Sequence, residues 1–255
     1  MKNKVVMTDI RKEDRMYQES IKNLRTSLLF SGVNTKVILM TSSFPNEGKS
    51  DVSFQLSREL GNISKKVLFL DADIRKSTMV TRYSVEGKIK GLSHYLSGQA
   101  GLDEVICETN YENVDIVFAG SLVPNPTELL ETDLMRELLE KMRDQYDYVI
   151  IDTPPLASMS DSLIVGKWCD GAIIVIEAGR VSYRIAQRVK QKLVDSGCKV
   201  LGAVLNKIDT TDYHYYGYYG KKYGYYGKKY GYYGKKDGYY GYYGPDTKEG
   251  ESADK

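Results

Sequence analysis

A loop at residues 43–50 ends in Gly48-Lys49-Ser50, between an apolar run at 37–40 and a helix predicted at 52–60. Gly-Lys-Ser between a strand and a helix is the context of a phosphate-binding P-loop. The loop's N–H groups and Lys49 would bind phosphates, and the Ser50 hydroxyl would ligate Mg²⁺. The predicted nucleotide-binding residues here are Pro45, Asn46, Glu47, Gly48, Lys49, Ser50 and Asp51. Because Ser43 replaces the first glycine of the motif, a simple turn is the alternative.

Three aspartates follow apolar runs elsewhere in the chain. Asp71 and Asp73 come after the run at 67–70, and Asp152 comes after the run at 148–151. Ligands of open α/β sheets bind outside the carboxyl ends of the strands, so these carboxylates are expected beside the P-loop. Their mutual repulsion is relieved if Mg²⁺ joins them to phosphate oxygens, with Ser50, Asp73 and Asp152 as the predicted metal ligands.

The elements that must position these residues alternate along residues 36–209. Runs of strand length are almost continuously apolar, as in parallel strands covered by helices on both faces. Predicted strands span 37–41, 67–70, 114–118, 148–151, 172–176 and 200–205, and predicted helices span 13–31, 52–60, 128–143 and 183–195. The pattern predicts a doubly wound α/β domain with a mostly parallel sheet.

Two further parts flank this domain of 36–209: an N-terminal segment, 1–35, with its own amphipathic helix, and a tail, 210–255. Residues 213–243 contain fifteen tyrosines, eight glycines and six lysines, in a seven-residue repeat. With no aliphatic residue there to build a core and much glycine entropy to lose, the tail is predicted to be disordered. An adhesive or self-associating segment is the alternative. The tyrosines are Tyr213, Tyr215, Tyr216, Tyr218, Tyr219, Tyr223, Tyr225, Tyr226, Tyr230, Tyr232, Tyr233, Tyr239, Tyr240, Tyr242 and Tyr243.

Composition excludes several classes of function. A formal net charge of +2 over 255 residues gives no electrostatic case for nucleic-acid binding. The three cysteines are far apart and fit small buried hydrophobes better than a disulfide frame or a zinc site. The start of the chain is charged, and no apolar run approaches the roughly 20 residues of a membrane span. A soluble cytoplasmic chain is therefore expected.

Taken together, these segments resemble the cytoplasmic bacterial tyrosine kinases (BY-kinases) of capsule and exopolysaccharide synthesis, which are P-loop proteins. The motifs at 44–50, 70–75 and 150–155 match those called Walker A, Walker A′ and Walker B in that family. Glu19, Lys22 and Arg25 are similar to its N-terminal E-x-x-R-x-x-R oligomerisation motif, although alone they fit a solvated helix face. The tail matches the family's autophosphorylated tyrosine cluster.

The resemblance implies ATP and Mg²⁺ as cofactors and the tail tyrosines as phosphoacceptors. Phosphoryl transfer depends mainly on positioning and charge neutralisation, so the implied catalytic residues are Lys49, Asp71, Asp73 and Asp152. Asp71 is the candidate to orient the tyrosine hydroxyl and to accept its proton, and Asp73 supports the metal and its waters. Asn206 either contacts the adenine edge, as the equivalent asparagine does in related ATPases, or caps a turn.

Two residues depart from the family's pattern. Asp51 stands where threonine usually follows the Mg²⁺-binding serine, and phosphate would repel its carboxylate unless it turns outward or lies on a Mg²⁺-bound water. Lys22 replaces an arginine, which keeps the charge but loses the bidentate fork. A weaker or shifted subunit contact is expected.

Partners are also implied by the resemblance. They are further copies of the chain in a ring with transfer in trans, a transmembrane activator of the polysaccharide co-polymerase type, and a cognate phosphotyrosine phosphatase. The same resemblance places the chain in the cytoplasm, at the inner face of the cell membrane through the activator.

Two alternatives remain open. ParA/MinD-type positioning ATPases share the fold and the aspartates, but they carry a lysine five residues before the P-loop lysine, where this chain has Phe44. A nucleotide-dependent scaffold with an aromatic tail and little kinase activity is the second. Phosphotyrosine formation with Mg-ATP separates both from a kinase.

Overall fold

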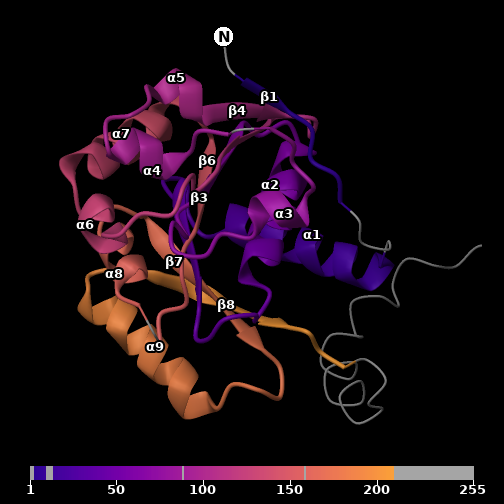
Figure 1. Ribbon diagram of the computed structural model, residues 1–255. Coiled ribbons are helices and arrows are strands. Elements are labelled where there is room, and N and C mark those ends of the chain that lie inside the picture. Colours follow the sequence, from indigo (N-terminus) through magenta and orange to yellow (C-terminus); the bar gives the residue numbers. More distant parts are fainter. Residues whose placement is uncertain (1–2, 10–13, 88, 158, 210–255) are drawn as a thin grey trace, which may run out of the picture. The chain divides into compact units, whose positions relative to one another are not determined.

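The computed structural model describes residues 3–9, 14–87, 89–157 and 159–209 (Figure 1). The predicted tail at 210–255, with its fifteen tyrosines, lies outside the described residues, and so does residue 13, where the first predicted helix begins.

Eight strands of the described residues form one sheet in the order β1-β4-β5-β3-β6-β2-β7-β8. The strands are β1 (Asn3–Val5), β2 (Val37–Ser42), β3 (Val67–Asp71), β4 (Ile106–Thr109), β5 (Val114–Val117), β6 (Tyr148–Asp152), β7 (Gly171–Glu177) and β8 (Val200–Asn206). Neighbouring strands are parallel except β4 and β5. The predicted mostly parallel α/β sheet is therefore confirmed. Strands β1 and β4 are not among the predicted strands, because each is at most four residues long and only partly buried and is too short to give a periodic signal.

Helices connect the strands. They are α1 (Arg15–Leu29), α2 (Lys49–Gly61), α3 (Met79–Arg82), α4 (Leu92–Leu96), α5 (Leu102–Val105), α6 (Pro126–Leu130), α7 (Asp133–Gln145), α8 (Asp161–Gly166) and α9 (Tyr183–Asp195). Within the described ranges, no helix is both long and apolar enough to cross a bilayer.

The single helix predicted at 128–143 is wrong, because the chain forms two helices there. It breaks at Thr132, which has an extended backbone and donates its hydroxyl hydrogen to the carbonyl oxygen of Leu129 at 2.8 Å. The break rotates the apolar stripe of α7, so that Leu134 is exposed and Met135 is fully buried. The regular spacing of leucines predicts one helix, because such spacing is the same whether the helix is continuous or is interrupted between two turns.

Two apolar cores lie on opposite faces of the sheet. Helices α1, α2 and α3 pack on one face, while α4, α6, α7, α8 and α9 pack on the other (Figure 1). Successive residues of β2 alternate between these cores, since Val37 and Leu39 join one and Ile38 and Met40 join the other. This two-sided cover explains why the strands are nearly continuously apolar.

The carboxyl ends of three central strands lie at one rim of the sheet, where the sequence predicts the functional residues. In the sheet, β6 lies between β3 and β2, and all three run parallel. The register pairs Asp71 with Asp152 and pairs Met40 with Asp152. The loop after β2 therefore begins next to the two strand-end aspartates, as the sequence predicted.

Candidate active site

The loop between β2 and α2 turns sharply at Gly48, which has a left-handed backbone (φ 86°) immediately before Lys49 begins α2. A Cβ atom at Gly48 would come within 2.1 Å of the side-chain nitrogen of Asn206. The backbone conformation thus favours glycine, and a larger residue would in addition displace the Asn206 side chain. The first-turn N–H groups of α2 point out of the helix start, where an anion binds favourably.

Glu47 stabilises the loop from inside. Its buried carboxylate accepts hydrogen bonds from the backbone N–H groups of Ser43 (3.2 Å) and Phe44 (2.9 Å). Burial raises the pKa of this carboxyl above its usual value, and the two N–H groups counteract the rise. Glu47 is among the predicted nucleotide-binding residues, whereas in the structure its side chain bonds to the loop itself. Its contact with a nucleotide stays a prediction.

The end of β8 holds the loop from outside. The Asn206 side chain donates a hydrogen bond to the carbonyl oxygen of Glu47 (2.9 Å), and Lys207 donates to that of Asn46 (2.5 Å). Lys207 also pairs with Glu177 of β7 at 3.1 Å. Neither sequence-based reading of Asn206, adenine contact or turn cap, included this bond between distant segments.

Replacing Asn206 with alanine is expected to raise KM for ATP roughly fivefold, as one lost neutral hydrogen bond suggests. If Asn206 supports the loop, GTP binding should weaken by the same factor; if Asn206 recognises adenine, the preference for ATP over GTP should fall instead. Asn3→Ala is the matched control, because its side chain donates to a backbone carbonyl at 2.9 Å far from the loop. Unchanged KM values for both nucleotides in Asn206→Ala would contradict a role for this side chain.

A buried ion pair lies at the rim. Lys49 Nζ is 2.5 Å from Asp152 Oδ1, and the two side chains are 7% and 1% exposed. The same lysine is 3.2 Å from Ser50 Oγ, and Ser53 Oγ is 3.4 Å from the Asp152 carboxylate. Three predicted site residues, one cation and two oxygen ligands, are thus brought together by β6 and the first turn of α2.

Asp71 faces this pair from the neighbouring strand. Its buried carboxylate accepts a hydrogen bond from the Ser77 hydroxyl and one from the backbone N–H of Asp73 at 3.2 Å. Burial, followed by the charge of Asp152, raises the pKa of Asp71 to about 7. Burial also raises the pKa of Asp73 above its usual value. The site therefore holds more negative charge than its single lysine compensates.

A bound Mg²⁺ ion would offset the excess negative charge of these aspartates, and a nucleotide would supply its remaining ligands. Among the described residues, no group of three or more His, Cys, Asp or Glu side chains could hold a metal ion by itself. Mg²⁺ commonly takes only one or two carboxylates from a protein and completes its shell with water and substrate phosphates. Ser50, Asp73 and Asp152 can supply such a partial set, and the loop N–H groups with Lys49 can bind the phosphates. These ligand assignments stay predictions.

An ion-pair network fixes the segment that carries Asp71 and Asp73. Arg75 donates to the fully buried carboxylate of Asp161 through Nε (2.6 Å) and a terminal nitrogen (3.0 Å). It also donates to Thr127 Oγ1 at 2.6 Å, and that hydroxyl is 3.1 Å from Asp161. No motif in the sequence pairs Asp161 or Thr127 with Arg75, since they lie 86 and 52 residues from it. An aspartate at the start of a short helix gave no distinctive signal.

Of the three residues assigned to oligomerisation, two have exposed side chains and the third pairs with a residue of α2. Glu19 and Lys22 pair with each other at 2.7 Å on an exposed part of α1. Arg25 instead pairs with Glu59 of α2 at 3.0 Å and is 20% exposed. Asp51 likewise has partners within the protein, in α1 and α3. Whether the three residues of α1 form a subunit contact stays a prediction.

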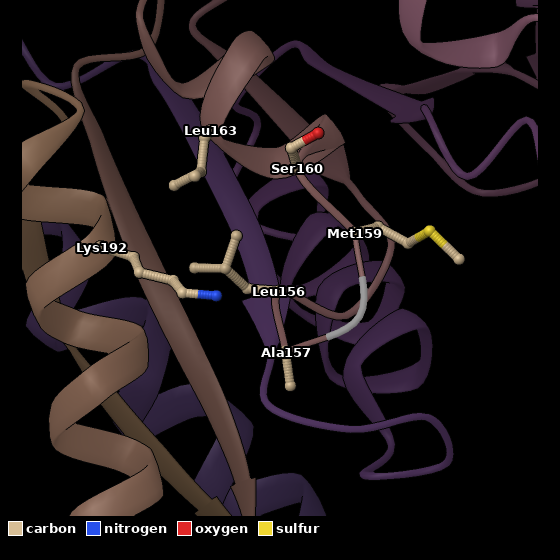
Figure 2. Close-up of a pocket in the computed structure, with 6 residues that line it drawn as sticks. All are labelled: Leu156, Ala157, Met159, Ser160, Leu163 and Lys192. Atoms are coloured by element: carbon tan, nitrogen blue, oxygen red, sulfur yellow. The ribbon is translucent and has the colours of Figure 1, made fainter.

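The structure also contains a cavity of about 290 Å³ (Figure 2). It is lined by side chains from the segment after β6, from α8 and from α9: Leu156, Ala157, Met159, Ser160, Leu163 and Lys192. None of the predicted site residues contributes to it.

The same fold and much of the same sequence occur in known proteins. A family model for an AAA domain matches residues 35–194. Tyrosine-protein kinase CpsD of Streptococcus agalactiae is 39% identical over 207 residues, which are 80% of this chain and 90% of that protein. The kinase domain of the Escherichia coli tyrosine kinase ETK gives a TM-score of 0.71 at 34% identity, over 76% of this chain and 78% of that one.

The fold alone is shared more widely. The cell division ATPase MinD of Pyrococcus furiosus gives a TM-score of 0.61 at 24% identity, over 70% of this chain and 74% of that one. Sequence identity thus favours the kinases over the positioning ATPases. The chain belongs to the family of bacterial tyrosine kinases, and it is a protein-tyrosine kinase built on a nucleotide-binding P-loop fold.

Proposed function

We propose that this kinase uses Mg-ATP to phosphorylate tyrosines of its own C-terminal tail, 210–255, within a ring of identical subunits. The observation that carries the proposal is the buried Lys49–Asp152 pair beside Asp71, at the start of the P-loop helix. A related fold supports the cofactor, because MinD of Pyrococcus horikoshii is described in complex with Mg-ADP. Fifteen tyrosines in one segment supply an acceptor cluster.

Each residue of the rim has a role in the proposed transfer. Lys49 and the loop N–H groups would bind the phosphates of ATP, and Ser50, Asp73 and Asp152 would hold a Mg²⁺ ion that neutralises charge on the phosphate oxygens. Asp71 would orient the tyrosine hydroxyl and accept its proton as the tyrosine oxygen bonds to the γ-phosphorus and the bond from that phosphorus to the ADP oxygen breaks. The Arg75–Asp161 pair keeps the Asp71 segment in place.

Phosphopeptide mapping after incubation with Mg-ATP tests the acceptor assignment. Phosphate is expected on tail tyrosines and is expected to be absent when Mg²⁺ is omitted. Tyr83 and Tyr146 are internal negative controls, because both are buried in the core. A protein that binds ATP and forms no phosphotyrosine in the tail would refute self-phosphorylation.

Mixing two full-length variants tests transfer between subunits. One carries Lys49→Met and an intact tail, and the other carries an intact P-loop with every tail tyrosine replaced by phenylalanine. Transfer in trans predicts phosphate on the Lys49→Met chain only when both are present. Transfer restricted to one chain predicts no phosphate on either.

The wider setting follows from the family resemblance. We propose that 1–35 forms the assembly segment, with Glu19, Lys22 and Arg25 at or near the subunit contact, 36–209 the kinase domain and 210–255 the acceptor tail. A transmembrane activator of the polysaccharide co-polymerase type would hold the kinase at the inner membrane face, and a phosphotyrosine phosphatase would reverse the modification. The regulated process would be capsule or exopolysaccharide synthesis and export. The alternative function, that of a ParA/MinD-type positioning ATPase, is disfavoured because this chain has Phe44 where those proteins carry a lysine.

A further inference from the structure

Asp51, the residue after the proposed Mg²⁺ ligand Ser50, has its two carboxylate oxygens directed to different helices. Tyr17 of α1 donates its hydroxyl hydrogen to Asp51 Oδ2 at 2.7 Å. A terminal nitrogen of Arg82, at the end of α3, lies 3.5 Å from Asp51 Oδ1. The carboxylate is 17% exposed, and Lys49 makes its short ion pair with Asp152 instead. Contacts with α1 and α3 therefore account for an acidic residue so close to a phosphate site.

The contact between Asp51 and Arg82 connects the P-loop helix, through α3, to the segment that carries Asp71. Helix α3 begins at Met79, whose backbone N–H is 3.2 Å from the Ser77 hydroxyl oxygen. The same Ser77 hydroxyl donates to Asp71. Asp51 is thus connected through α3 and Ser77 to the proposed proton acceptor, so it joins the P-loop helix to the segment that carries Asp71.

The other contact joins α2 to α1 at the loop end of α2. A second polar contact, Arg25–Glu59 at 3.0 Å, joins the same two helices near the other end of α2. Asp51 and Glu59 are eight residues apart, about 12 Å along a helix. Attachment at two points this far apart fixes both the position and the direction of α2 relative to α1. The Tyr17–Asp51 bond is the one at the first turn, beside Lys49 and Ser50.

We propose that Asp51 is a positioning residue: together with Tyr17 it couples the placement of α1 to the geometry of the phosphate-binding loop. The inference rests on the proposed assignment of that loop as the ATP site. Loop N–H groups, Lys49 and Ser50 must converge on the phosphates, and displacements of about 1 Å are costly at such sites. Loss of the Tyr17 hydroxyl should therefore weaken nucleotide binding, although Tyr17 lies on α1 and is not one of the proposed nucleotide ligands.

The test measures binding of fluorescent Mg-ADP, which needs no chemistry, together with KM for ATP and the thermal midpoint without nucleotide. Tyr17→Phe is expected to weaken Mg-ADP binding about tenfold, the size expected for a lost hydrogen bond to a charged group, and Asp51→Ala, which also loses the contact with Arg82, by at least that factor. The double variant should bind no more weakly than Asp51→Ala alone, since that substitution already removes the interaction with Tyr17. Arg82→Gln, which retains the Tyr17–Asp51 bond, should have a smaller effect.

Tyr111→Phe is the matched control. Its hydroxyl donates to the carbonyl oxygen of Met7 at 3.2 Å, so its loss should lower the thermal midpoint without changing nucleotide affinity. If Tyr17→Phe leaves affinity unchanged, the coupling is refuted; an effect of Asp51→Ala alone would then mean that Asp51 acts through Arg82 or directly on nucleotide or metal. Additive effects in the double variant would refute it too. Lys49→Met checks the underlying assignment separately, because normal Mg-ADP binding by that variant would show that the loop is not the nucleotide site.

Discussion

Replacing Lys49 with methionine is expected to abolish tyrosine phosphorylation and, without nucleotide, to lower the free energy of unfolding by about 3–5 kcal/mol. The first effect follows from losing the cation that binds the terminal phosphates. The second follows from the buried pair, because Asp152 is 1% exposed and would lose the ammonium 2.5 Å away. Phosphotyrosine assays and urea unfolding without Mg²⁺ measure the two effects separately.

A second substitution separates loss of charge balance from loss of packing. Lys49→Met with Asp152→Asn removes both charges, so much of the lost stability should return while activity stays absent. Lys49→Arg keeps the positive charge and should be more stable than Lys49→Met. If Lys49→Met unfolds at the same urea concentration as the unmodified protein, the ion pair contributes nothing to the nucleotide-free fold.

Replacing Asp71 with asparagine is expected to stabilise the nucleotide-free, magnesium-free protein at neutral pH and to reduce phosphoryl transfer strongly. Burial and the neighbouring Asp152 raise the pKa of Asp71 from 3.8 to about 7. The folded state therefore holds this proton more tightly than the unfolded chain does, and this carboxyl contributes a loss of stability as the pH rises from about 4 to about 7. Asparagine is uncharged and can still accept the Ser77 hydrogen bond, so the variant should avoid that loss.

Unfolding curves between pH 4 and pH 8 measure the effect. The stability advantage of Asp71→Asn should be absent near pH 4 and should grow to a few kcal/mol at neutral pH, at about 1.4 kcal/mol per pKa unit. The matched control is Asp161→Asn, whose carboxylate is equally buried but pairs with Arg75 at 2.6 Å. That substitution should destabilise the protein. If the Asp71→Asn protein is less stable than the unmodified protein at pH 7, the negative charge of Asp71 beside Asp152 does not destabilise the fold as expected.

The sequence by itself determined the fold class and the group of residues that meet at the rim. Apolar runs alternating with helical patterns indicate parallel strands with helices between them, and the strand order β3-β6-β2 is in line with that. Parallel strands end on one rim, so Asp71 and Asp152 had to approach the loop that ends in Lys49. These inferences need only local patterns and the geometry of a sheet.

Only the tertiary structure decided which hydrogen-bond and ion-pair partners these side chains have. Glu47 folds back into its own loop, Asn206 holds that loop from β8, and Arg25 turns to Glu59. Such contacts join segments up to about 160 residues apart, and they depend on how one element is rotated against another, which hydrophobic spacing does not encode. Asp51 is the clearest example: the sequence marks it only as a charge beside a phosphate site, and the structure gives it Tyr17 and Arg82 as partners.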